Sequence, residues 1–164
     1  MSWWLRHIGW WPPLFGTGIK VTRLDKDLRA VDVEMRLRPW NTNVMGVHFG
    51  GSLFAMTDPF YMIMLATNLG REYVVWDKAA SIRYKRPGDG LVRAEFRLTE
   101  ERLKEIKSAL ETERRHDARF LVEVKDGEGK VVAEVERVIY CATKDAHAER
   151  KKLRDGVSER GSSR

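Results

Sequence analysis

The segment from Leu53 to Leu69 constrains the fold most, because it is apolar almost all the way round. Its hydrophobic residues include Phe54, Met56, Phe60, Tyr61, Met62, Ile63, Met64 and Leu65. A helix without a polar face must be enclosed by protein or by lipid. A membrane span needs about 20 predominantly apolar residues, whereas this segment contains Asp58, Pro59 and Asn68. We therefore predict a long helix that is buried inside a folded domain.

The composition fits one globular domain. The chain has 164 residues, of which 43% are hydrophobic and 33% are charged, so it can bury a core and is too apolar to be intrinsically disordered. Cys141 is the only cysteine and the start of the chain shows no secretory signal, which together predict a reduced, cytoplasmic protein. The net charge of +6 comes from interleaved charges of both signs. We therefore expect no nucleic-acid partner, and single-stranded nucleic acid ranks last among the candidate ligands.

Alternating apolar and polar residues predict six strands around this helix. An antiparallel sheet needs one covered face, and only the segment from Leu53 to Leu69 is apolar enough to cover it. The predicted fold class is therefore α+β, with a curved antiparallel sheet wrapped around one long central helix. We expect two strands between Thr17 and Pro39, further strands over Val74–Tyr84, Leu91–Leu98, Ala118–Lys125 and Lys130–Ala142, a hairpin turn at residues 126–129, and a second helix from Thr99 to Glu113.

Two flanking segments differ from this domain, which we place at residues 17–144. Residues 1–16 carry Trp3, Trp4, Leu5, Ile8 and Trp11 at helical spacing, and Pro12-Pro13 is expected to end any helix there. We favour an amphipathic segment that docks on the domain over one that lies at a membrane surface, because few basic residues accompany the tryptophans. Residues 145–164 are strongly charged and are expected to form a frayed C-terminal tail.

A glycine-rich stretch before and within the start of the predicted helix carries the best evidence for function. It contains Asn43, Gly46, Gly50, Gly51 and Asp58, at the spacing of the motif of small acyl-CoA thioesterases. Over residues 17–144 the chain resembles the hotdog-fold thioesterase superfamily, and most resembles a branch without an assigned activity. The motif histidine of that family aligns with Phe49, while the histidine of this chain, His48, stands one position earlier.

The resemblance implies an assembly and a reaction. Two sheets would join in a homodimer, or further in a tetramer, with the sites at the subunit interface. The reaction would be hydrolysis of acyl-CoA or a related acyl thioester, with no cofactor other than the coenzyme A of the substrate. The displaced histidine and Pro59 favour a non-catalytic alternative, in which the same cavity binds an acyl chain or acyl-CoA without cleaving it. Four scattered histidines predict no metal site.

Thioester hydrolysis needs one group that polarises the carbonyl and another that activates water or attacks directly. Backbone N–H groups at a helix start can polarise a carbonyl, and Gly50 and Gly51 let a ligand approach them closely. Asp58 is the candidate general base or nucleophile. The alternative is that Asp58 caps a helix whose first residue is Pro59.

Three neighbours of the glycines have supporting roles in this hypothesis. Asn43 would orient water or the thioester, and Phe49 would contact the substrate. His48 would assist if its ring points inward. The alternative, which we favour, is that His48 is a hydrogen-bonded loop residue.

Cationic residues of the following strand are candidate substrate contacts. Arg83, Lys85 and Arg86 would contact the phosphates of coenzyme A, although a solvated strand end commonly carries such residues. Lys78 is another candidate, because an ideal strand would point it into the apolar layer, where an ammonium needs a partner. Asp58 is one conceivable partner, and Asp77 is expected on the opposite face. A bulge or an edge position that brings Lys78 to water is the favoured alternative. The residues that share its strand parity are Val74, Trp76, Ala80, Ile82 and Tyr84.

Overall fold

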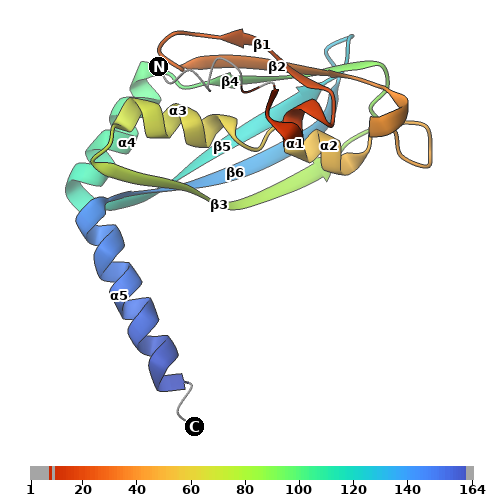
Figure 1. Ribbon diagram of the computed structural model, residues 1–164. Coiled ribbons are helices and arrows are strands. Elements are labelled where there is room, and N and C mark those ends of the chain that lie inside the picture. Colours follow the sequence, from red (N-terminus) through yellow and green to blue (C-terminus); the bar gives the residue numbers. More distant parts are fainter. Residues whose placement is uncertain (1–7, 9, 162–164) are drawn as a thin grey trace.

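The computed structural model describes residue 8 and residues 10–161, which form one sheet with helices on and around it (Figure 1). The expectations for Trp3, Trp4 and Leu5 lie outside the described residues. In chain order the elements are α1 (Pro12–Phe15), β1 (Ile19–Leu24), β2 (Ala30–Arg36), the 3-10 turn η2 (Pro39–Asn41), α2 (Gly50–Ala55), α3 (Phe60–Leu69), β3 (Tyr73–Tyr84), β4 (Leu91–Arg97), α4 (Glu100–Glu113), β5 (Arg115–Lys125), β6 (Val131–Thr143) and α5 (Lys144–Gly161).

The six strands form a single antiparallel sheet in the order β1-β2-β4-β5-β6-β3. The sheet curves around α3, which lies across its concave face (Figure 1). The predicted curved antiparallel sheet around a central helix is confirmed. The predicted hairpin turn is also confirmed, because the Asp126 carboxylate accepts hydrogen bonds from the N–H groups of Glu128 at 3.0 Å and Lys130 at 2.9 Å.

Aromatic rings join α3 to the concave face of the sheet. The Phe60 ring centroid lies 4.8 Å from that of Phe96, and Tyr61 stacks on Phe120 at 3.9 Å. Burying one such side chain completely contributes about 1.5–3 kcal/mol. These contacts explain why so apolar a helix is stable here, since Phe60, Tyr61, Met64, Leu65 and Leu69 are buried, whereas Ala66 and Thr67 form its exposed side.

The predicted long helix is two helices, which corrects the expectation for residues 53–69. Helix α2 ends in a 3-10 turn. The N–H of Thr57 donates to the carbonyl oxygen of Phe54 at 3.0 Å, and the N–H of Asp58 donates to the carbonyl oxygen of Ala55 at 3.1 Å. Pro59 then occupies the N-cap position of α3 and has no N–H to continue the ladder. The side chain of Asp58 does not cap α3, so the capping interpretation is also wrong.

The N-terminal segment packs on the domain as expected, with Ile8 and Leu14 buried in its core. The 3-10 helical residues Ile8 and Trp10 are followed by a bend at Trp11. Pro12 and Pro13 then begin α1, because the missing N–H of proline costs nothing in a first turn.

The expected frayed tail forms α5, which extends away from the sheet (Figure 1). Asp145 lies in its first turn, where a negative charge suits the helix dipole, and Arg114 bonds Glu149 at 3.0 Å. Among the described residues, no helix is long and apolar enough to cross a membrane.

A bulge in β3 decides which side chains face the central helix. The register of β3 against β6 shifts between Asp77 and Ala79, so Lys78 is the extra residue. Paired residues of an antiparallel ladder share a face, and Asp77 pairs with the buried Ile139. Asp77 therefore lies on the concave side, where the ideal alternation places Trp76 instead. The predicted position of Asp77 on the opposite face is wrong.

Candidate functional site

A pocket of about 250 Å³ lies where α1, α2 and the turn before α3 meet. Its lining includes Gly51 of α2 and Asp58 of the turn, so the short α2 brings the candidate carbonyl-polarising and base groups to one hollow of one chain. Trp11 and Leu14 of the N-terminal segment close another side. The remaining lining residues are Pro13, Phe54, Ala55 and Pro59.

The start of α2 presents unpaired amides, as the hypothesis requires. The N–H groups of Gly50 and Gly51 donate to no acceptor among the described residues. An exposed aromatic side chain lies close to each glycine. A Cβ on Gly50 would lie 2.6 Å from the Tyr84 hydroxyl oxygen, and one on Gly51 would lie 2.4 Å from the Phe49 ring. The exposed Phe49 side chain, which was expected to contact the substrate, lies against Gly51 and is not part of the lining of the Asp58 pocket.

The Asp58 carboxylate meets an arginine that sequence reasoning missed. Arg137 Nη2 donates to Asp58 Oδ1 at 2.8 Å and to the Asp58 carbonyl oxygen at 2.9 Å. The same nitrogen donates to Asp77 Oδ1 at 2.5 Å. A signal was present in the sequence, because Arg137 alternates with Val135 and Ile139 and so shares their buried face of β6.

Lys78 is not a partner of Asp58. Its ammonium pairs with Asp117 of β5. Asp117 shares a face with Tyr140 and Trp76 across the ladders, which is the face opposite to Asp77. The bulge therefore lets Lys78 reach an ion pair near water, which confirms the favoured interpretation and leaves its substrate-binding role without support from the geometry.

Two residues of the glycine-rich stretch, Asn43 and His48, stabilise the loop through hydrogen bonds to its backbone or to a neighbouring turn. The His48 ring is buried and its Nε2 lies 3.1 Å from the carbonyl oxygen of Gly90. Burial lowers the pKa of His48, which keeps the imidazole neutral. Asn43 Oδ1 accepts from the N–H groups of Met45 at 2.9 Å and Val47 at 3.3 Å. Neither side chain lines the Asp58 pocket, so the geometry gives both a loop-stabilising role.

The three expected phosphate contacts lie at the end of β3 and just beyond it. Arg83, Lys85 and Arg86 are all exposed. Lys85 Nζ lies 2.9 Å from Glu134 Oε2, so part of its charge is already compensated. Among the described residues, Arg83 and Arg86 form no ion pair.

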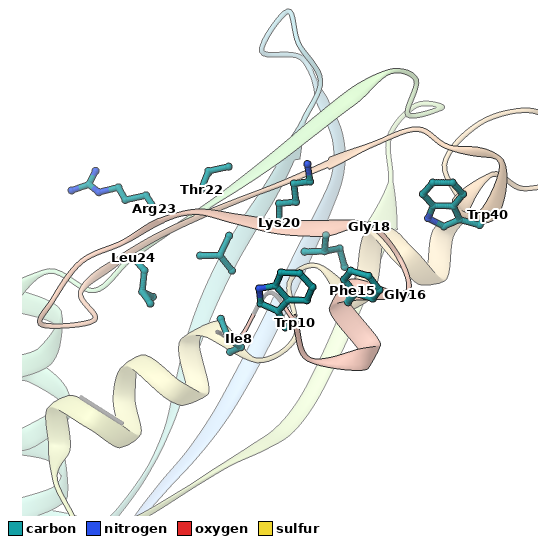
Figure 2. A pocket seen from close by; sticks show the side chains of 12 residues that line it. Ile8, Trp10, Phe15, Gly16, Gly18, Lys20, Thr22, Arg23, Leu24 and Trp40 are labelled. Carbon is teal, nitrogen blue, oxygen red and sulfur yellow. The ribbon is translucent and has the colours of Figure 1, made fainter. Parts of the chain in front are cut away.

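A second and larger hollow, of about 760 Å³, runs along the open edge of β1. Figure 2 shows its walls, with Trp10, Phe15 and Trp40 around the hollow and Ile8 and Leu24 below β1. The Trp10 and Phe15 rings stack with centroids 5.6 Å apart. Helix α1 separates this hollow from the Asp58 pocket, because Phe15 lines the first and Leu14 the second.

The larger hollow is apolar on its inner side. The side chains of Lys20, Thr22 and Arg23 point to the other side of β1 in Figure 2, and Arg23 is engaged by Asp25 at 2.8 Å. Across the described residues, no group of three or more histidine, cysteine or acidic side chains is arranged to hold a metal ion.

Fold and site together define a hotdog-fold protein with a pocket whose lining includes Gly51 and Asp58. The chain belongs to DUF4442, a family described as a domain of unknown function, whose model matches residues 5–141. No curated protein matches the chain.

Several solved structures share the fold. A protein of unknown function from Pseudomonas aeruginosa, described as a probable thioesterase, has a TM-score of 0.70 and 21% identity over 79% of this chain and 86% of that one. A thioesterase from Haemophilus influenzae has a TM-score of 0.61 and 13% identity over 87% and 93%. The phenylacetic acid degradation protein PaaI from Thermus thermophilus has a TM-score of 0.53 and 23% identity over 79% and 97%. At these identities the likeness concerns the fold.

Proposed function

We propose that this protein hydrolyses acyl-CoA or a related acyl thioester in the cytoplasm. The observation that carries the proposal is the joint lining of one pocket by Asp58 and Gly51. The carbonyl oxygen of the thioester would accept from the free N–H groups at the start of α2, which stabilise the charge that develops there. Two structural neighbours named as thioesterases support this assignment.

The water that attacks the thioester would be activated by Asp58. Asp58 Oδ1 is bonded to Arg137, while Oδ2 accepts no hydrogen bond from the described residues and can receive a proton from water. The water oxygen bonds the acyl carbon, the carbon–sulfur bond breaks, and the proton passes to the departing thiolate. The products are a carboxylic acid and free coenzyme A.

The first test is thiol release from acyl-CoAs of short, medium and long chain length. We expect Asp58→Asn to lose about 100-fold or more of the wild-type rate, because general base catalysis contributes about 10²–10⁴-fold. Asp145→Asn is the matched control, since Asp145 is exposed on α5. A thiol-reactive dye reports coenzyme A alone here, because burial raises the pKa of Cys141 to about 12. Equal rates for wild type and Asp58→Asn would contradict the mechanism.

The larger hollow favours a second candidate function, which is binding of an acyl chain without cleavage. Its volume of about 760 Å³ falls within the roughly 300–1,000 Å³ of small-molecule sites. Aromatic and aliphatic side chains form most of its lining, to which Lys20, Thr22 and Arg23 also contribute. An extended acyl chain is complementary to such a surface, because it buries apolar area without leaving polar groups unpaired.

Binding of fatty acids tests this candidate independently of hydrolysis. We expect affinity to rise with chain length in calorimetric titrations, since each buried CH₂ contributes about 0.8 kcal/mol. Trp10→Ala should weaken the binding, because Trp10 forms a wall of the hollow. Trp76→Ala is the control, because Trp76 is also largely exposed, at 61% against 72% for Trp10, but lies on β3. Affinity that is independent of chain length, or equally weakened by both substitutions, would exclude the hollow as the site.

A further inference from the structure

One arginine lies almost completely buried under the candidate site. Arg137 is 1% exposed, and Nη2 alone makes all of its hydrogen bonds to Asp58 and Asp77. Removing a guanidinium from water is costly unless carboxylates compensate it. Arg137 is therefore held in place by the two aspartates, and it holds them in return.

The pattern of its hydrogen bonds differs from that of a stabilising ion pair. A guanidinium normally binds a carboxylate through two nitrogens of its fork. Arg137 Nε and Nη1 instead have no acceptor among the described residues, and its Cζ lies 5.7 Å from the centre of the Phe54 ring. Buried unpaired donors are rare in proteins, and each calls for a specific explanation, such as a functional role or an ordered water.

The two aspartates sit in different environments around the same nitrogen. The Asp58 side chain is 54% exposed and lines the pocket, whereas that of Asp77 is 31% exposed. Burial raises the pKa of Asp77, with the hydrogen bond and charge of Arg137 opposing the effect and the charge of Asp58 adding to it. Arg137 from β6 and Asp58 from the turn before α3 are the charged groups that face Asp77, since Lys78 pairs with Asp117.

We propose that Arg137 is the positioning residue of the Asp58 site and that Asp77 anchors it. The guanidinium donates hydrogen bonds to the carbonyl oxygen and to Oδ1 of Asp58. These bonds fix both the turn and the carboxylate rotamer, and they leave Oδ2 free to bind the water that attacks the substrate. Asp77, on the neighbouring strand, keeps the guanidinium from following Asp58 into the pocket. The proposal rests on the thioesterase function for its catalytic consequence.

Kinetics of three variants test the catalytic consequence. Arg137→Met keeps the shape of the side chain and removes its charge, and we expect kcat to fall about 100-fold, the effect of misplacing a reacting group by about 1 Å. KM should change little, because Arg137 is buried away from the substrate. Arg137→Lys should recover part of kcat, since an ammonium keeps the charge without the fork. Asp77→Asn should lower kcat less than Arg137→Met.

Arg97→Met is the matched control for a merely structural effect. Arg97 also bonds two carboxylates, those of Asp32 and Glu95, but it does so on β4. We expect its removal to leave kcat unchanged even if the melting temperature falls. Arg137→Met with wild-type kcat, or Arg97→Met with the same loss, would overturn the proposal. If Arg137→Met does not fold, Arg137→Lys and Asp77→Asn carry the test.

A titration that needs no activity separates this proposal from the thioesterase function. Carbon-13 NMR of labelled aspartate carboxyls should show the Asp77 pKa rising further in Arg137→Met, because the hydrogen bond and charge that oppose burial are gone. Arg97→Met should leave it unchanged. If the Asp77 pKa is the same in the wild type, Arg137→Met and Arg97→Met, Asp77 does not anchor Arg137. If the Asp77 pKa rises in Arg137→Met but the wild type releases no thiol, the anchoring by Asp77 is supported and the thioesterase function is rejected.

Discussion

His48 shows how a single buried polar residue links the site loop to the rest of the domain. Its ring is 2% exposed and joins the glycine-rich loop to the turn that contains Gly90. The ring also packs beside Gly88, where a Cβ would lie 3.4 Å from His48 Cδ2 and 3.0 Å from Val132 Cγ1. A neutral imidazole suits this position, since a charged one would have to be desolvated without a carboxylate bonded to it.

The lowered pKa of His48 predicts a loss of stability in mild acid. As the pH falls through the unfolded-state pKa of about 6.5, His48 becomes protonated in the unfolded chain while it is still neutral in the folded chain. The free energy of unfolding should therefore fall, by at most about 1.4 kcal/mol per pH unit, until the pH reaches the lower folded-state pKa. Urea denaturation between pH 8 and pH 5 measures this slope.

His48→Gln supplies the comparison for that slope. Its amide can still donate to the Gly90 carbonyl oxygen but does not titrate, so the variant should lose less stability than the wild type over the same pH range. Titration of the carboxylates is common to both proteins and cancels in the difference. Parallel pH profiles would show that His48 binds its proton equally well in the folded chain.

At the scale of elements, the hydrophobic periodicity predicted the regular helices and strands correctly. It failed where a single residue interrupts a regular element. The strands and the turn at Asp126 follow from alternation and turn chemistry, which are local properties. The break before α3 was visible as Asp-Pro, but the apolar pattern continues across it and predicted one uninterrupted helix. Pro59 decided the outcome, because a residue without an N–H cannot continue the ladder.

The bulge at Lys78 had the largest effect on the site and the weakest sequence signal. One extra residue moves every side chain on one side of it to the other face, so Trp76 and Asp77 exchanged their expected places. The Arg137 cluster could not be assembled from sequence while Asp77 was assigned to the wrong face. The Asp58 and Gly51 pocket was predictable, because both residues lie within one short stretch of chain.

At the scale of the whole molecule, β3 forms a long edge of the sheet, which pairs with β6 on one side and with no strand of the described residues on the other. It is 12 residues long, and its side chains from Trp76 to Ser81 are exposed. Natural proteins seldom leave so long an edge open, because its free N–H and C=O groups invite another strand. We propose that β3 pairs with β3 of a second copy, in the two-fold homodimer that the family resemblance implies.

Proline substitutions at two consecutive residues of β3 test this dimer. Successive N–H groups of a strand point to opposite sides, so one of Ala80 and Ser81 donates toward β6 and the other toward the open edge. Ala80→Pro and Ser81→Pro should therefore differ. One should lower the melting temperature, and the other should convert the dimer to a monomer with little loss of stability, as sedimentation velocity and thermal unfolding would show.

The same pair of variants connects assembly to the site. Asp77 lies on β3 itself, three residues before Ala80, so a partner strand on this edge would lie beside the Asp77 and Arg137 pair. The monomeric proline variant should accordingly release less thiol than the wild type at equal folded concentration. In the monomer, water reaches the Asp77 and Arg137 pair and weakens the electrostatic attraction between Arg137 and Asp58. A wild type that sediments as a monomer at micromolar concentration, or proline variants that behave alike, would show that this edge is not the interface.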